Sequence, residues 1–270
     1  MLRGRSVACW TVALGLALSG PLSLAATAGL SAEQIVDRYV SARGGSKAWQ
    51  KVQTMVWNGH IESASTMSSQ MPFIMMFKRP DLTRFEITAE GQKAVRVFDG
   101  KGGWKLHTAA NGRPQVQDYD PEEVSFARDA LGVDGPLVDH QSKGVKVALR
   151  GSGEVEGHKA YQLSVTLPSG AVHQVWIDAH SFLELKYERQ ARSASGHSGS
   201  VSVYYRNYQT IQGLTLPMLI ETGGGQHQTS DRMIIERVAL NPTLAETSFW
   251  RPIVGPSRRA APRDIPQGEP

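Results

Sequence analysis

The chain has 270 residues, a single cysteine and a formal net charge of +4. One cysteine cannot form a disulfide framework or a cysteine metal site. Half of the net charge belongs to Arg3 and Arg5 at the N-terminus and the other half to the tail after Trp250, so the body between them is close to neutral. It has no basic stripe of the kind that contacts nucleic acid, and we therefore expect no nucleic-acid partner.

Residues 1–28 read as a signal peptide. The segment Val7–Leu24 is apolar apart from small polar residues, and Ala26–Ala28 supplies the small-x-small pattern that precedes cleavage before Gly29. A membrane anchor is the alternative, but Pro21 and several small residues interrupt the run, and a bilayer needs about 20 apolar residues. Cleavage would also remove Cys9. We expect an exported protein whose mature chain has no cysteine.

Residues 31–43 form the first predicted helix. Ser31 suits the N-cap, Gln34 completes a capping box, and Gly44–Gly45 suits the C-terminal end. One face is apolar, as in an amphipathic helix. A second short helix is expected to begin at Ser46 and to include Trp49. The apolar face of the first helix comprises Ile35, Val36, Tyr39 and Val40.

From Met55 to Trp104 the apolar residues recur every second position, and turn residues follow about every ten positions. This pattern indicates antiparallel hairpins. Asp120 and Pro121 then begin a third helix, which Glu123 caps and which ends near Gly132. Strands resume afterwards, at Tyr161–Thr166, Val172–Asp178, Leu183–Glu188, Val201–Tyr208, Leu214–Glu221 and Met233–Leu240.

The fold class that follows is mainly β (α+β), with one continuous antiparallel sheet and short helices. Strand–helix alternation of the parallel kind is absent. A sheet of nine or more twisted strands tends to curl, so we expect the helices to lie on its concave side. The domain should span residues 29–250, and the period-free segment 251–270, rich in Pro, Arg, Ala and Gly, should be a disordered tail.

A search for reactive groups favours a protein that is not an enzyme. Histidines with a carboxylate four positions away, such as His158 with Glu154 and His180 with Glu184, lie near strand ends or in loops and not on a predicted helix, so we expect no metal. Ser198 has Gly196 two positions before it, but Ser200 stands two positions after it, where a nucleophile elbow needs its second glycine. No glycine-rich dinucleotide motif opens a helix. The pair Glu122 and Glu123 is explained by helix capping. We expect no catalytic residue and no cofactor.

Apolar residues are in surplus at particular places. Methionines and aromatic residues crowd between Met67 and Phe77, and unbranched methionine chains adapt to varied ligands. An ordinary core strand is the alternative interpretation. Several aromatic residues further along also lie in alternating runs. The candidate ligand-binding residues lining a cavity are Trp57, Ile61, Met71, Phe73, Met75, Phe77, Trp104, Phe126, Trp176 and Tyr205.

A family resemblance rests on motifs in a fixed order. They are the leading helix ending in Ala42–Gly45, the turn and strand Asp99–Trp104, Val175–Asp178, Tyr205–Pro217 and Glu236–Asn241. Together with the signal peptide, they resemble periplasmic outer-membrane lipoprotein-sorting proteins of the LolA/LolB-like superfamily. The resemblance implies an unclosed β half-barrel capped by helices, with an apolar cavity for acyl chains, in the periplasm. Arg43 and Arg128 are candidates for the arginine that holds the lid helix in that family.

Three functions remain as hypotheses. The first is a monomeric periplasmic carrier that holds acyl chains of lipoproteins or other lipids without chemistry, with a possible protein partner in the inner or outer membrane. The second is an envelope-stress sensor or protein-interaction module on the same fold. The third is a hydrolase, for which the sequence supplies no nucleophile with a base and an orienting group.

Overall fold

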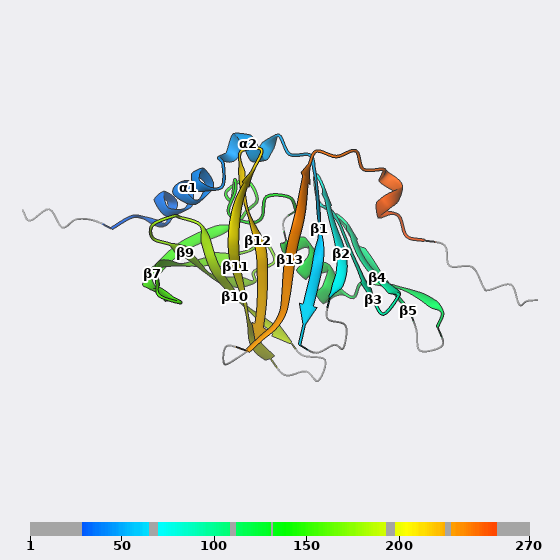
Figure 1. Ribbon diagram of the computed structural model, residues 1–270. Helices are drawn as coiled ribbons and strands as arrows, with labels where there is room; N and C mark the ends of the chain where they lie inside the picture. Colours follow the sequence, from blue (N-terminus) through cyan, green and yellow to red (C-terminus); the bar gives the residue numbers. More distant parts are fainter. Residues whose placement is uncertain are drawn as a thin grey trace, which may run out of the picture. The chain divides into compact units, whose positions relative to one another are not determined.

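A computed structural model describes residues 29–64, 70–108, 112–130, 132–192, 198–224 and 228–252 (Figure 1). The chain divides into an N-terminal unit, Met1–Leu30, and a second unit, Ser31–Pro270, to which all the elements below belong. The predicted signal peptide (1–28), Met67 and residues 253–270 of the predicted tail lie outside the described residues.

The described strands form one antiparallel sheet, as the repeated hairpins predict. They are β1 Thr54–Ser63, β2 Met71–Lys78, β3 Leu82–Ala89, β4 Gln92–Asp99, β5 Gly103–Thr108, β6 Pro114–Asp118, β7 Lys146–Val155, β8 His158–Thr166, β9 Val172–Asp178, β10 Glu184–Arg192, β11 Ser198–Ile211, β12 Leu214–Gly224 and β13 Gln228–Leu240. In the described part of the chain the sheet has 13 strands, in the order β6-β5-β4-β3-β2-β1-β13-β12-β11-β10-β9-β8-β7. β6 and β7 are unpaired edges, so the sheet is not closed.

The central pair, β1 with β13, joins the N-terminal hairpins to the C-terminal ones. The register between them shifts at Gly59, where the two backbones approach closely. A Cβ atom at Gly59 would lie 1.9 Å from the carbonyl oxygen of Ile234. Glycine is therefore required at position 59. Just beyond β13, the side-chain oxygen of Asn241 accepts a hydrogen bond from the backbone N–H of Gln53 at 2.7 Å.

The helices begin where the capping residues predict. They are α1 Ala32–Ala42, α2 Ser46–Gln50 and α3 Pro121–Asp129. Ser31 and Gln34 form the capping box of α1, and Asp120 and Glu123 form that of α3. Trp49 of α2 is fully buried. In Figure 1, α1 and α2 lie across one end of the strands, and α3, in green, is seen behind β13 and β1.

The contacts of α3 show how strongly the sheet curls. Glu123 accepts a hydrogen bond from Lys105 Nζ of β5 at 2.8 Å and lies 3.3 Å from Arg96 Nη1 of β4. Three residues after Glu123, the ring of Phe126 lies 4.6 Å below the guanidinium of Arg189 on β10. Strands β4 and β10 are seven strand spacings apart, about 34 Å along the sheet. A helix of nine residues is about 13 Å long.

Both strands reach one short helix because the sheet curls around it. The face that carries Arg96 and Arg189 is therefore the concave one, and α3 lies within it. This confirms the predicted fold class, an unclosed half-barrel with helical structure on its concave side.

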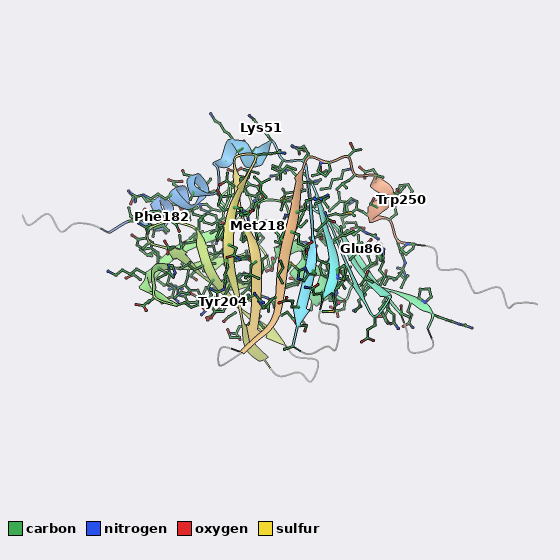
Figure 2. The ribbon with its side chains drawn as sticks, viewed as in Figure 1. Lys51, Glu86, Phe182, Tyr204, Met218 and Trp250 are labelled. Carbon is green, nitrogen blue, oxygen red and sulfur yellow. The ribbon has the colours of Figure 1, made fainter. Side chains whose placement is uncertain are left out.

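The opposite, convex face is covered at one place by the 3₁₀ helix η1, Glu246–Phe249. Phe249 packs there with Val97 and Trp104, and Arg84 Nη1 donates to the carbonyl oxygen of Ser248 at 2.7 Å. Glu86, labelled in Figure 2, is buried on this face and forms ion pairs with Arg84 and Lys93. The convex face therefore has its own small core below η1.

Candidate functional site

Apolar side chains form a contiguous surface on the concave face, which we call the concave cluster. Cross-strand register brings Trp57, Met75 and Phe85 side by side on that face. Phe73, Met218 and Ile235 are buried within the cluster. Its partly exposed members are Trp57, Ile61, Met75, Phe85, Ile211, Ile220, Met233 and Val238. The described helices therefore leave part of this surface uncovered.

One end of the concave face is packed solid. Trp49 of α2 lies there against Met55, Phe77 and Val138, all of which are buried. Val133 and Val138 belong to the segment between α3 and β7, so this segment and α2 together fill the end of the half-barrel. At this end the apolar face is an ordinary core.

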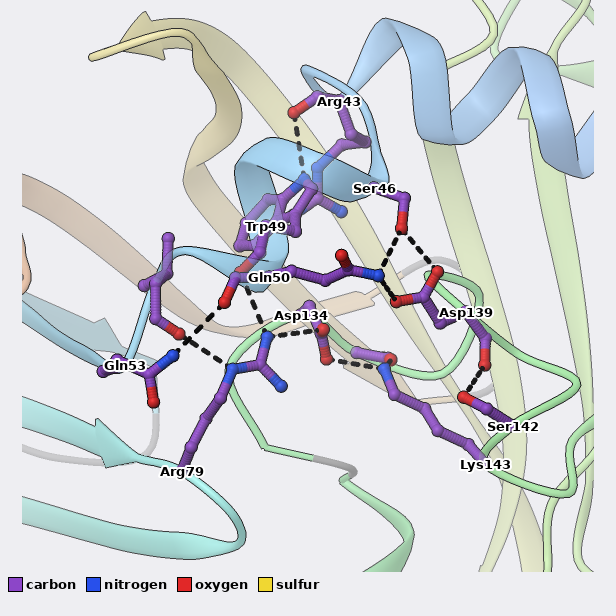
Figure 3. A network of polar contacts seen from close by, with 12 residues as sticks. Arg43, Ser46, Trp49, Gln50, Gln53, Arg79, Asp134, Asp139, Ser142 and Lys143 are labelled. Atoms are coloured by element: carbon purple, nitrogen blue, oxygen red, sulfur yellow. Dashed lines mark hydrogen bonds and ion pairs between the residues drawn. The ribbon is translucent and has the colours of Figure 1, made fainter.

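A network of polar side chains fixes α2 and the segment between α3 and β7 in place (Figure 3). The Asp134 side chain, 2% exposed, accepts hydrogen bonds from Arg79 Nη2 at 2.7 Å and from Lys143 Nζ at 2.5 Å. Arg79 also donates to the carbonyl oxygens of Trp49 and Val52. Burial lowers the pKa of Lys143, which the Asp134 carboxylate opposes. The network binds the segment after α3 to β2 and α2, and each of its charges has a partner.

The other half of the concave face carries polar aromatic residues and a buried acid. Arg43 Nε donates to the carbonyl oxygen of Thr215 at 2.7 Å, and its Nη1 donates to Tyr39 Oη at 2.6 Å. Burial raises the pKa of Glu184 to about 8, although the positive charge of Arg43 opposes the change. Burial also raises the pKa of Tyr205 well above its ordinary value. At neutral pH these groups are uncharged apart from Arg43.

Most of the residues predicted to line a cavity share the concave face. Strand alternation and register place seven of them there from the sheet, and Phe126 joins them from α3 with 54% of its surface exposed. Met71, Phe73 and Phe77 are buried, whereas Trp57, Ile61, Met75 and Tyr205 keep partial exposure. Whether they bind a ligand stays a prediction.

Trp104 and Trp176 lie on the convex face, so the structure does not bring them to this site. Trp104 pairs with Val97 across the strands and its Nε1 donates to the carbonyl oxygen of Phe249 at 3.3 Å. Lys186 Nζ lies 4.6 Å from the ring of Trp176, on the outward side of β10. Each tryptophan has the opposite strand parity to the residues that line the concave side.

The sequence interpretation missed several residues of the concave face. Met218, Ile220 and Met233 belong to the concave cluster, and Glu184 and Arg189 supply ionisable groups on the same face. The alternation Met218–Ile220 in β12 was a usable signal, because Leu214 and Leu216 continue it. Nothing local distinguishes Glu184 from an exposed glutamate, since its burial comes from the curl of the sheet.

Solved structures with a similar fold exist. The LolA superfamily protein from Nitrosomonas europaea aligns over 83% of this chain and 99% of its own, with a TM-score of 0.53 and 13% identity. The chain has a LolA-like fold. A DUF1329 family protein from Desulfovibrio piger aligns over 81% of this chain and 97% of its own, with a TM-score of 0.54 and 14% identity. At such identities the likeness concerns the fold.

The family resemblance predicted from the sequence is thus confirmed for the LolA-like fold. No protein-family model matches the sequence, and no curated protein matches it. Within the described ranges, no helix has both the length and the apolar character needed to cross a membrane. Nor do the described residues gather three or more histidine, cysteine, aspartate or glutamate side chains in the manner of a metal site.

Proposed function

We propose that the protein is an exported carrier that holds an acyl chain of a lipid or lipidated protein against its concave cluster, without chemistry. The observation that carries the proposal is the incompletely covered apolar surface on the concave side of an open sheet. Partly exposed apolar side chains gathered on one face are a usual mark of a ligand or partner site. The LolA-like fold supports the same proposal.

The driving force would be burial of the chain. Each methylene that leaves water contributes about 0.8 kcal/mol, so a twelve-carbon chain gains on the order of 9 kcal/mol before costs. Ordering of the chain and displacement of covering side chains reduce this gain to a reversible affinity. A reversible affinity suits a carrier, which must release its cargo.

The α3 helix would be the element that yields to the chain. None of its nine residues, all of them described, is buried. It is held mainly by polar contacts, such as those of Glu123 with Lys105 and of Asp129 with Ser169 Oγ at 2.6 Å. Polar contacts of partly exposed groups are individually weak. A chain that enters between α3 and the sheet therefore has little apolar packing to displace.

The direct test is to purify the protein from its native envelope and to analyse extracted lipid by mass spectrometry, followed by titration with a fluorescent fatty acid. We expect bound lipid or saturable uptake. Absence of both would contradict the proposal. Localisation to the periplasm is tested by fractionation and by the N-terminal sequence of the mature protein, expected at Gly29.

Two adjacent methionines on β2 provide a matched pair of variants. Met75 belongs to the concave cluster, whereas Met76 faces the convex side below η1, and both are half-buried. Met75→Gln is expected to weaken acyl-probe binding by roughly tenfold, since a polar group replaces apolar contact. Met76→Gln makes the same chemical change and should leave binding unaltered. Equal effects of the two variants on binding would place the ligand elsewhere.

A further inference from the structure

Three buried side-chain atoms have no hydrogen-bond partner among the residues described, and all belong to the concave side or to α3. They are Trp57 Nε1, Asp129 Oδ1 and Arg189 Nε. Buried polar groups are almost always hydrogen-bonded, so orphaned ones call for an explanation such as a bound molecule. Two are donors and one is an acceptor, which defines what a bound molecule must offer.

Asp129 and Arg189 belong to one polar group of side chains beside Phe126. Arg189 lies over the Phe126 ring, and the charges of Asp129 and Arg189 both act on His173 of β9. The His173 ring stacks on Tyr187 of β10 at 5.5 Å. These residues lie on the concave face or on the helix that crosses it. We call them the α3 polar site: Asp129, His173, Tyr187 and Arg189.

The α3 polar site is close to neutral overall. Arg189 and Asp129 carry opposite charges. Burial lowers the pKa of His173, with Asp129 opposing and Arg189 adding to the decrease, so the imidazole is uncharged at neutral pH. Burial likewise raises the pKa of the Tyr187 hydroxyl, which therefore keeps its proton. The site has no excess positive charge to attract an anion.

The two orphaned atoms of this site select the ligand chemistry. Arg189 Nε needs an acceptor, and Asp129 Oδ1 needs a donor. A carboxylate or a phosphate diester can satisfy the arginine but has no hydrogen to give the aspartate, and its charge would face that of Asp129. A hydroxyl group both donates and accepts, and an ester carbonyl adds an acceptor without charge.

We propose that the α3 polar site binds the uncharged, hydroxyl-bearing ester head of an acylglycerol whose chain lies on the concave cluster. The inference rests on the proposed function, since it names the head group of the molecule whose chain that function places. It assigns the concave cluster to the chain and the region below α3 to the head.

The test uses three ligands with the same fourteen-carbon acyl chain to displace a fluorescent acyl probe from the mature chain. They are 1-monomyristoylglycerol, methyl myristate and myristate. We expect the acylglycerol to displace the probe at concentrations at least tenfold lower than either of the others. Equal displacement by all three, or a preference for myristate, would overturn the head-group inference while leaving the carrier function intact. No probe binding at all would overturn both.

A pair of variants on α3 tests whether Asp129 determines the selectivity for the head group. Asp129→Asn removes the charge that faces the head group, so binding of myristate should improve relative to the acylglycerol and the selectivity should fall severalfold. Glu122→Gln makes the same change at an exposed position of the helix and should leave the selectivity unaltered. Unchanged selectivity in Asp129→Asn would overturn the assignment of Asp129. If that variant does not fold, the comparison of the three ligands on the natural chain still decides.

Discussion

Replacing Glu184 with glutamine is expected to change how stability depends on pH. Burial raises the pKa of Glu184 from 4.5 to about 8 in the folded protein, with Arg43 opposing. The unfolded chain therefore releases this proton near pH 4.5, whereas the folded chain keeps it until about pH 8. Between these values the folded state binds the extra proton. Its contribution to stability is complete below pH 4.5 and is lost as the pH rises to about 8.

The size of the effect follows from the same shift. Each pKa unit corresponds to about 1.4 kcal/mol, so the free energy of unfolding falls by up to about 5 kcal/mol across this range because of Glu184. Glutamine has nearly the same shape and does not ionise. The Glu184→Gln variant should have about the stability of the natural protein near pH 5 and should become the more stable of the two as the pH approaches 9.

Urea unfolding at several pH values from about 5 to about 9 measures this difference directly. Glu154 provides the control, because it is exposed on the edge strand β7 and Glu154→Gln makes the same chemical change. The control should run parallel to the natural protein at every pH. If the Glu184→Gln variant also runs parallel to it, the carboxyl group is ionised in the folded protein and our account of the buried acid is wrong.

Three further substitutions test the packing of the half-barrel by urea unfolding. Asp134→Ala leaves Arg79 and Lys143 without their buried partner and should lower the free energy of unfolding by about 3–5 kcal/mol. Its control, Asp81→Ala at an exposed position nearby, should lower it little, and equal losses would contradict the role of the network. Gly59→Ala forces a Cβ atom against a backbone oxygen of β13 and should cost about 1–3 kcal/mol or more; Gly102→Ala, which has open space, is its control, and a stable Gly59→Ala protein would argue against the close approach. Trp49→Ala should cost about 3–5 kcal/mol, since the ring is fully buried, and a smaller loss would mean that the end of the half-barrel is not packed as described.

Helix starts were predictable because capping is local. Ser31 with Gln34, and Asp120 with Glu123, each place an acceptor and a donor within one turn, and both pairs form as predicted. The hairpins were predictable for a similar reason, since alternation and turn residues lie within about twenty positions. The single antiparallel sheet follows from these local signals and the absence of parallel crossovers.

The two edge strands were not predicted. β6 is only five residues long and begins with Pro114, and β7 exposes most of its side chains on both faces. An edge strand with little burial has no reason to alternate apolar and polar residues, so periodicity does not reveal it. β6 is defined by its pairing with β5, and β7 by its pairing with β8. The residues of β6 and β7 alone do not predict this pairing.

The candidate site was predictable on one strand pair and not across the whole sheet. Alternation separates the residues of each strand into two faces, but it does not say which face is concave. For β1 and β2 the apolar face is the inner one, and Trp57 and Met75 were assigned correctly to it. For Trp104 and Trp176 the outward face also carries a large aromatic ring, which η1 covers at Trp104 and the ammonium group of Lys186 contacts at Trp176. Only the pairing register, followed across successive strands, shows which face of each strand is the concave one.

The connection between the two edges explains why α3 should be the least stable part of the concave side. Because β6 and β7 are consecutive in sequence but lie at opposite edges of an open sheet, the segment between them has to cross the sheet, and the contacts of α3 show that it does so on the concave side. α1 buries Ile35, Val36 and Tyr39, whereas α3 buries none of its side chains. Local opening is easiest where few apolar contacts are lost. We therefore expect the amide hydrogens of α3 to exchange much faster than those of α1 in hydrogen-exchange mass spectrometry, and the exchange of α3 to slow when a ligand binds beneath it. Protection of α3 equal to that of α1 in the ligand-free protein would mean that the helix is fixed in place and that a chain cannot enter by displacing it.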